Sequence, residues 1–220
     1  MGDLTLPQFL AVASIPLLFA ITVHEVAHGW IAKRLGDPTA QRLGRLTLNP
    51  IKHIDPVGTV AVPLIMLLLS GGSMAFGWAK PVPVAFRNLR NPKRDMVLVA
   101  AAGPGANFTM AAMWAVLAAV LLSAMDLQGT VAQWLVNMCV FGMQINVILA
   151  VFNLLPLPPL DGGRVLAGLL PAGGANFLDR IEPFGFMIVV VLMVTGVLWT
   201  IMDPFRRFFL DFYFSIAGLA

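Results

Sequence analysis

Two histidines, His24 and His28, stand four positions apart in the sequence His24-Glu25-Val26-Ala27-His28, within an otherwise apolar stretch. On a helix this spacing offsets the two side chains by only about 40° around the axis, so both imidazoles face one point and can bind one metal ion. Glu25 stands beside the first histidine, where its carboxylate can accept a proton from a water molecule that attacks a peptide carbonyl. The spacing therefore predicts a metal site with a general base next to it.

The apolar surroundings of these three residues favour a functional role for them. Ionisable side chains inside a membrane-spanning helix are costly to insert, rare and usually functional. The alternative is a purely structural polar network that needs no metal.

Asp161 is the best candidate for the third protein ligand that a catalytic metal requires beside an open coordination position. It ends the sequence Asn153-Leu154-Leu155-Pro156-Leu157-Pro158-Pro159-Leu160-Asp161, which follows a long apolar helix and is followed by two glycines. The prolines and glycines break the helix and free backbone groups, and such a break within lipid is tolerated only where it lines a polar site. The alternative is that Asp161 is the N-cap of a following helix through residues 164–170.

These two motifs resemble those of the site-2 proteases, a family of intramembrane zinc metalloproteases. The chain resembles a compact form of this family without soluble sensor domains. His24-Glu25-x-x-His28 matches the metal motif of the family, and Asn153-x-x-Pro156 with Asp161-Gly162 matches the second motif. Three more segments match: Leu48-Asn49-Pro50-x-x-His53-x-Asp55-Pro56-x-Gly58, Gly77-Trp78-Ala79-Lys80-Pro81-Val82-Pro83 and Ala102-Gly103-Pro104-x-x-Asn107. The resemblance covers residues 24–164, about two-thirds of the chain.

The resemblance implies one zinc ion per chain, held by His24, His28 and Asp161, with Glu25 as the general base. It also implies regulated intramembrane proteolysis, in which peptide bonds in or near the transmembrane segments of single-span membrane proteins are hydrolysed. Ligand types and geometry alone would also permit another borderline divalent ion. Cysteine does not enter the site, because Cys139 is the only one in the chain and a metal site must be built from His, Asp and Glu.

Three further polar residues are candidates for substrate binding or transition-state stabilisation. The amide of Asn153 could hydrogen-bond an extended substrate or the developing oxyanion, or only satisfy the helix break. Asn107 could position the substrate, or hydrogen-bond between helices. His53 lies in a turn-rich segment and could stabilise the tetrahedral intermediate or protonate the leaving amine; the alternative is an ordinary loop histidine held by Asp55.

The composition requires a membrane protein to carry these residues. Of the 220 residues 59% are hydrophobic and only 11% are charged, whereas an ordinary soluble domain has about 25% charged residues. Apolar stretches long enough to cross a bilayer lie at residues 7–31, 96–125, 127–160 and 183–202. We therefore expect a mainly α, polytopic membrane protein with four full spans and one domain over residues 1–220, made of a core (7–170) and a C-terminal hydrophobic segment (183–220). The first span is expected to be retained rather than cleaved as a signal peptide, because its first residues lack a basic cluster.

The distribution of basic residues predicts the orientation in the membrane. Five follow the first span and five precede residues 96–125, namely Lys33, Arg34, Arg42, Arg45, Lys52, Lys80, Arg87, Arg90, Lys93 and Arg94. By the positive-inside rule both loops are cytoplasmic and the N-terminus begins outside. We therefore expect a protein of the cell (inner) membrane of a prokaryote, with its active site nearer the cytoplasmic side. The net charge of +3 suits lipid head groups and does not indicate nucleic-acid binding, because the basic residues are spread over loops.

Residues 57–70 lie between the two basic loops. If both loops are cytoplasmic, this stretch of 14 residues cannot be a single crossing of the membrane. The stretch predicts a re-entrant helix, followed by a short membrane-associated β element over residues 78–86, where Pro81 and Pro83 alternate as on an edge strand. Such an edge, over residues 76–86, could bind an unwound substrate by β-addition. The alternative is a lipid-facing loop.

Two other functions are compatible with polar residues in a membrane. A metal-binding transporter would spread ionisable residues over several spans, but residues 96–125 contain none. A non-catalytic binder of membrane segments would have no need of Glu25 beside a metal ligand. The pair Arg206-Arg207 leaves the orientation of the C-terminal segment open.

Overall fold

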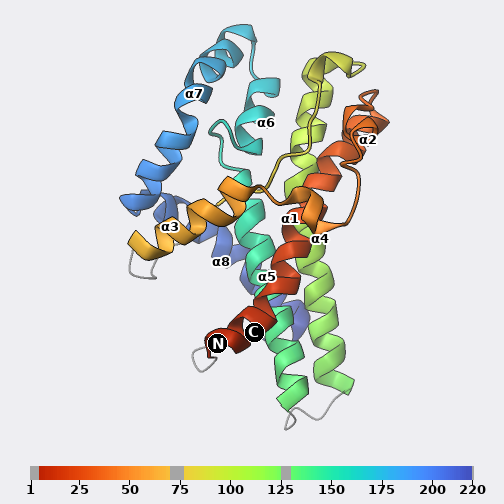
Figure 1. The fold of residues 1–220 in the computed structure, drawn as a ribbon, viewed down its shortest axis with the longest axis vertical. Helices are drawn as coiled ribbons and strands as arrows, with labels where there is room; N and C mark the ends of the chain where they lie inside the picture. The colour runs from red at the N-terminus through yellow and green to blue at the C-terminus, as the bar shows by residue number, and fades with distance from the viewer. Residues whose placement is uncertain (1–4, 70–76, 125–129, 220) are drawn as a thin grey trace.

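The computed structural model describes residues 5–69, 77–124 and 130–219, and most of them are helical (Figure 1). The helices in chain order are α1 (Leu6–Arg34), α2 (Thr39–Arg42), α3 (Val62–Leu69), α4 (Pro92–Ala124), α5 (Thr130–Asn153), α6 (Asp161–Leu169), α7 (Ala172–Val194) and α8 (Val197–Ala217). Two short 3-10 helices, η1 (Pro50–His53) and η3 (Phe86–Asn88), and one π-helix, η2 (Pro56–Ala61), lie between them.

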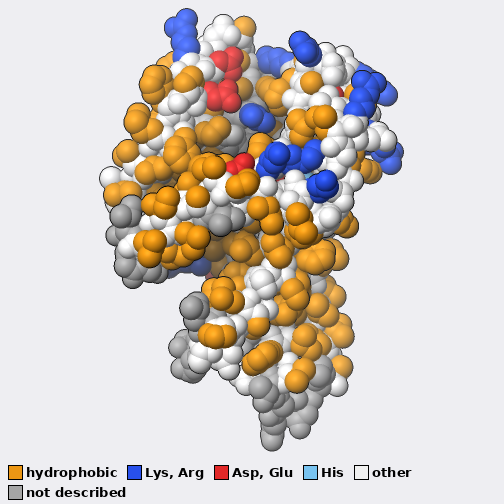
Figure 2. All heavy atoms as spheres, viewed as in Figure 1, with side chains coloured by type: hydrophobic (Ala, Val, Ile, Leu, Met, Phe, Trp, Pro, Cys, Tyr) orange, Lys and Arg blue, Asp and Glu red, His pale blue; other side chains and the backbone are white. Residues whose placement is uncertain are grey.

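Three helices, α1, α4 and α5, are apolar and long enough to cross a membrane. Helices α7 and α8 meet at a bend of 81° and pass the same test only as a pair, so the described chain has three helices that could span, or four spans if the bent pair counts as one. The straight span expected at residues 183–202 is therefore wrong, because the bend falls within it. Figure 2 shows Lys and Arg side chains gathered at the end that carries α2, with hydrophobic side chains over the rest of this face. The prediction of a mainly α, polytopic membrane protein is confirmed.

Helix α4 is the centre of the packing, since α1, α5, α6 and α8 all contact it (Figure 1). Its fully buried Ala111, Ala115 and Ala118 belong to one core cluster with Met143 of α5 and Met202 of α8. Small residues at such positions let helix backbones approach closely, which stabilises helix pairs in lipid. α5 and α8 are thereby held on α4.

The short helix expected at residues 57–70 is present as η2 followed by α3. Asp55 caps it, since its carboxylate accepts hydrogen bonds from the N–H groups of Val57 and Gly58. The apolar helical stretch over Pro56–Leu68 is shorter than the roughly 20 residues that a crossing needs. Its entry into the membrane and its return stay predictions, because residues 70–76 lie outside the described chain.

The expected strand over residues 78–86 is not found, and no strand is assigned anywhere in the part of the chain that the structure describes. The segment has no regular secondary structure before η3, and its N–H groups donate to η1, η2 and a side chain rather than to a neighbouring strand. Trp78 N–H donates to Gly58 O and Lys80 N–H to His53 O. Pro81 and Pro83 have no N–H and cannot donate to a ladder. The alternation of prolines does not by itself provide a strand partner, and the binding of an unwound substrate along this segment stays a prediction.

Candidate metal centre

His24 and His28 of α1 and Asp161 of α6 come together although they are more than 130 positions apart in the sequence. The Nε2 atoms of the two histidines are 3.0 Å apart, and Asp161 Oδ2 lies 3.2 Å from that of His24 and 3.3 Å from that of His28. Both histidines are buried, and the side chain of Asp161 is 12% exposed. These three residues form the one group of His, Cys, Asp and Glu side chains among the described residues that could hold a metal ion.

The spacing of these atoms fits zinc. A tetrahedral zinc ion with bonds of about 2.0 to 2.1 Å separates its ligand atoms by about 3.3 Å, close to the three distances above. Asp161 Oδ2 is also buried without a hydrogen-bond partner. Because a buried, unpartnered carboxylate oxygen is costly, a cation between the three side chains would account for its position.

Both imidazoles are oriented from behind by α4. His24 Nδ1 lies 2.6 Å from Asn107 Oδ1, and His28 Nδ1 lies 2.7 Å from the carbonyl oxygen of Val99. A carbonyl oxygen can only accept, so Nδ1 carries the proton and Nε2 presents its lone pair toward Asp161. Metal-binding histidines are commonly fixed by such a partner on the other ring nitrogen.

Asn107 acts between helices rather than at an exposed surface. Its side chain is fully buried, and its amide donates to Ala20 O at 3.1 Å and to Asn146 Oδ1 at 2.8 Å. Asn146 of α5 in turn donates to Gly142 O. This network joins α1, α4 and α5 behind His24 and uses both N–H groups and the oxygen of the buried Asn107 amide. The interpretation of Asn107 as an interhelical residue fits these contacts, and the substrate-binding one does not.

Two residues next to the metal group were not among the sequence candidates: Asn146 and Gly103. A Cβ atom on Gly103 would lie 2.4 Å from His28 Nε2 and 2.6 Å from His24 Cε1, so α4 reaches the imidazoles only because this residue has no side chain. The sequence signal for Asn146 was an asparagine within an apolar stretch. For Gly103 it was a glycine four residues before Asn107.

Asp161 is positioned by glycines that follow it. A Cβ atom on Gly162 would lie 2.2 Å from Leu154 O, and one on Gly163 would lie 2.4 Å from Pro158 N. The start of α6 is therefore in close contact with the segment that follows α5. Asp161 is the first residue of α6, whose N-cap is Leu160, and no side chain caps the helix. The alternative that Asp161 serves as an N-cap is therefore wrong.

Glu25 lies on a neighbouring face of α1 and is partly buried. Its Oε2 accepts a hydrogen bond of 2.6 Å from the N–H of Val82, in the extended segment before η3. The two remaining candidates do not join the metal group. Asn153 donates to Leu149 O within its own helix. His53 is buried with Nε2 2.9 Å from Thr47 O, so the expectation that Asp55 holds it is wrong.

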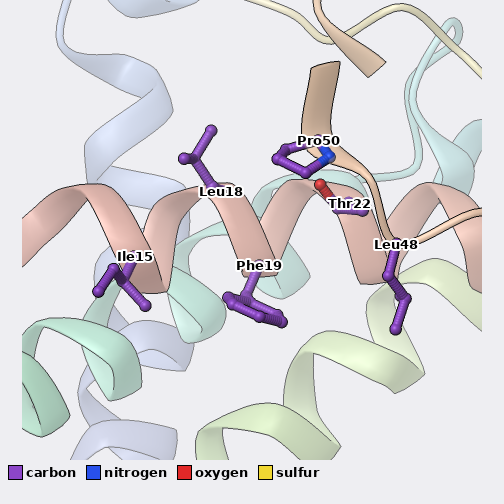
Figure 3. Close-up of a pocket in the computed structure, with 6 residues that line it drawn as sticks. All are labelled: Ile15, Leu18, Phe19, Thr22, Leu48 and Pro50. Carbon is purple, nitrogen blue, oxygen red and sulfur yellow. The ribbon is translucent and has the colours of Figure 1, made fainter. Parts of the chain in front are cut away.

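An apolar hollow of about 100 Å³ lies on α1 before the histidines (Figure 3). It is lined by Ile15, Leu18, Phe19, Thr22, Leu48 and Pro50. The lining contains no ionisable group, so the hollow offers a hydrophobic surface and no acid, base or metal ligand.

Asp37, in the loop after α1, fixes the far end of the extended segment. Its buried carboxylate accepts hydrogen bonds from the N–H of Ala85, the amide of Asn88 and both the N–H and hydroxyl of Thr39. Burial alone would raise the pKa of this carboxyl, but these donors, led by the Thr39 hydroxyl and Asn88, hold the pKa below its ordinary value.

Comparison with known proteins gives one consistent family. The model of peptidase family M50 matches residues 119–196. "Putative zinc metalloprotease YwhC" of Bacillus subtilis is 40% identical over 208 residues, which cover 92% of this chain and 90% of that protein. "Putative zinc metalloprotease Rip2" of Mycolicibacterium smegmatis is 30% identical over 214 residues, which cover 92% of this chain and 73% of that protein. No solved structure matches the chain. Because the similarity to the Bacillus subtilis protein runs over nearly the whole of both chains and the zinc-compatible group lies within it, the chain belongs to peptidase family M50, the site-2 protease family, and is an integral membrane zinc metallopeptidase.

Proposed function

We propose that this zinc metallopeptidase is an intramembrane endopeptidase that hydrolyses peptide bonds in or near the transmembrane segments of single-span membrane proteins, in regulated intramembrane proteolysis. The depth of the metal group supports this function. His24 lies ten residues before the basic end of α1 at Lys33 and Arg34, and ten residues of helix measure about 15 Å. A peptide bond that reaches Asp161 and His24 must therefore enter the apolar layer.

Each side chain of the group has a separate task in the proposed reaction. His24, His28 and Asp161 would hold the zinc ion, which when bound supplies Lewis acidity to the peptide carbonyl and to water. Glu25 would accept a proton from the attacking water and deliver it to the leaving nitrogen, so that one C–N bond breaks as one C–O bond forms. Asn107 and the carbonyl of Val99 keep the two imidazoles in the required orientation.

Substrate contacts are proposed for two further residues. Asn153 is partly buried at the end of α5, eight residues before Asp161, and is our candidate for contact with an extended substrate or the oxyanion. His53 has a buried Nδ1 without a hydrogen-bond partner and is our candidate for stabilising the tetrahedral intermediate after a rearrangement of η1.

We further propose that the protein lies in the cell (inner) membrane of a prokaryote, with its N-terminus outside and the metal centre nearer the cytoplasmic face. The gathering of basic side chains at one end of the molecule supports this orientation, because Lys and Arg are enriched in cytoplasmic loops (Figure 2).

The test pairs metal analysis of the purified protein with cleavage of a panel of single-span peptides by the wild type and Glu25→Gln. We expect one zinc ion per chain in both proteins and cleavage by the wild type alone, because glutamine keeps the shape of Glu25 but cannot accept the proton. Fragment masses should place the cut in or next to the apolar segment. Cleavage by Glu25→Gln at the wild-type rate would refute the proposed role of Glu25, and cuts confined to soluble peptides would refute intramembrane proteolysis.

A further inference from the structure

We propose that the main-chain N–H of Val82 is the positioning group for the catalytic base. The inference rests on the proposed role of Glu25. Val82 N–H donates to Glu25 Oε2 over 2.6 Å, and Val82 is 6% exposed. Oε1 receives no hydrogen bond from the described residues and is left for proton transfer.

A glutamate on a helix needs such a partner because its side chain is long and flexible. Glutamate is among the side chains that lose the most rotamer entropy when they are fixed in one conformation. A hydrogen bond from a backbone N–H to a carboxylate is charge-assisted and about twice as strong as one between neutral groups. One oxygen held on Val82 therefore restricts the rotation of the whole carboxylate.

The residues next to Val82 make this donor specific. Pro81 and Pro83 restrict the backbone on both sides and have no N–H, so Val82 offers the sole donor over residues 81–83. On α1, Gly29 lies one turn after Glu25, and a Cβ atom there would be 2.7 Å from Val82 Cγ1. Val82 can therefore lie directly against α1 because position 29 has no side chain.

The extended segment that carries Val82 is fixed on both sides of it. Trp78 N–H donates to Gly58 O over 3.0 Å and Lys80 N–H to His53 O over 2.9 Å. Ala85 N–H donates to Asp37 Oδ2 over 2.7 Å. N–H groups of alternate residues in an extended chain point to the same side, so the donor at position 82 continues the row of positions 78 and 80. The backbone of the segment is therefore held in place on both sides of Val82, and the N–H of Val82 holds Glu25.

The test replaces this N–H with an ester oxygen, which also weakens the carbonyl of Pro81 as an acceptor for Arg45. 2-Hydroxyisovaleric acid, incorporated at position 82 by nonsense suppression, replaces the amide with an ester and keeps the valine side chain. We expect kcat to fall about 10- to 100-fold, in line with the loss of a hydrogen bond to a charged group, with KM and zinc content unchanged. The same ester at Val84, whose N–H makes no hydrogen bond within the described structure, is the matched control and should leave kcat unchanged.

A double-mutant cycle with Glu25→Asp separates an effect through the base from a general structural one. Aspartate is one methylene shorter and does not reach Val82, so the ester at 82 should lower the residual kcat of Glu25→Asp by less than twofold. A wild-type kcat for the ester at 82, an equal loss in the Glu25→Asp background, or a loss carried by KM or zinc content would overturn the positioning role. Glu25→Gln, assayed in parallel, keeps the two proposals apart: its inactivity beside a fully active ester at 82 would reject only the inference about Val82, whereas a fully active Glu25→Gln would reject the base itself.

Gly29→Ala tests the same contact by ordinary mutagenesis. The new methyl group would lie 2.6 Å from Leu46 Cδ2, 2.7 Å from Val82 Cγ1 and 3.0 Å from Ala40 Cβ. It would displace Val82 together with Leu46 from α1, so kcat should fall while zinc binding remains. Gly105→Ala is the control, since a Cβ atom there meets no atom within 4 Å. A Gly29→Ala protein that is folded, binds zinc and keeps the wild-type kcat would argue against the inference.

Discussion

Replacing Gly103 by alanine should disable the metal centre, although Gly103 has no side chain and binds nothing. Its Cβ atom would lie 2.4 Å from His28 Nε2 and 2.6 Å from His24 Cε1. These separations are about 1 Å shorter than ordinary contact between non-bonded atoms. Either the two imidazoles or α4 must therefore move by a comparable distance.

Neither movement leaves the metal site intact. The rings are tied to α4 by Asn107 and by the carbonyl of Val99, so a shift of α4 carries their partners away, and a shift of the rings breaks both hydrogen bonds. Binding sites need their ligands within about 0.5 Å of the productive position, and loss of an outer-shell partner alone typically costs 10- to 100-fold in metal affinity. Both rings are affected, so we expect zinc affinity to fall at least about 100-fold, which corresponds to about 2.7 kcal/mol.

The assay is a competition titration of zinc against a chelator, on protein purified in detergent, with peptide cleavage measured in parallel. Gly105→Ala, two residues further along α4, is the control because it has open space around it. Both substitutions improve helix propensity by roughly 0.5 to 1 kcal/mol, so any difference between them reports the contact with the imidazoles. Wild-type zinc affinity and turnover in Gly103→Ala would refute the proposed packing of α4 on the metal site.

Three further predictions address the surroundings of the site. Asn107→Ala removes the partner of His24 Nδ1 and should lower zinc affinity about 10- to 100-fold and stability by about 1 to 3 kcal/mol, measured by zinc titration and thermal unfolding; unchanged zinc affinity would contradict it. Zinc at 100 times its Kd should stabilise the wild type by about 2.7 kcal/mol, so a chelator should lower the Tm of the wild type but not that of Asp161→Ala, and equal shifts would count against the metal group. The pKa of Asp37 is lower in the folded chain than in the unfolded one, so its contribution is present above about pH 4 and is lost as the pH falls below it. Unfolding measured between pH 3 and pH 6 should show a smaller loss in Asp37→Asn than in the wild type, and identical profiles would contradict the assignment.

The metal group was predictable because its signal is local. The spacing of His24 and His28 fixes their common face on any helix, and Asp161 was the acidic residue at the one long helix break. The membrane architecture was predictable for a similar reason, since an apolar run of sufficient length has few other stable states. Neither inference required knowledge of which helix packs on which.

The errors concern the hydrogen-bond partners that particular groups have in the fold. Pro81 and Pro83 indicate an extended backbone over this segment. They do not reveal that the N–H groups of the segment donate to η1, η2 and Glu25 instead of to a strand. Asp55 stands two residues from His53, yet its carboxylate caps the helix that follows. The contribution of Gly103 depends on how closely α4 approaches α1, which no local pattern encodes.

The two histidine ligands and the proposed base lie on neighbouring faces of α1 and are held by different parts of the chain. His24 and Glu25 differ by one residue, which is about 100° of rotation on a helix. The histidine face lies against α4, where Gly103 makes room for the imidazoles, whereas the face of Glu25 lies against the extended segment, where Gly29 makes room for Val82.

Because these two faces of α1 are supported separately, a glycine-to-alanine substitution on each face should impair a different property. Gly103→Ala should reduce zinc affinity, so that added zinc restores part of the lost activity. Gly29→Ala should reduce kcat at full zinc occupancy, so that added zinc restores none. If both variants responded to zinc in the same way, the two faces of α1 would be one coupled unit, and metal binding could not be separated from the positioning of Glu25.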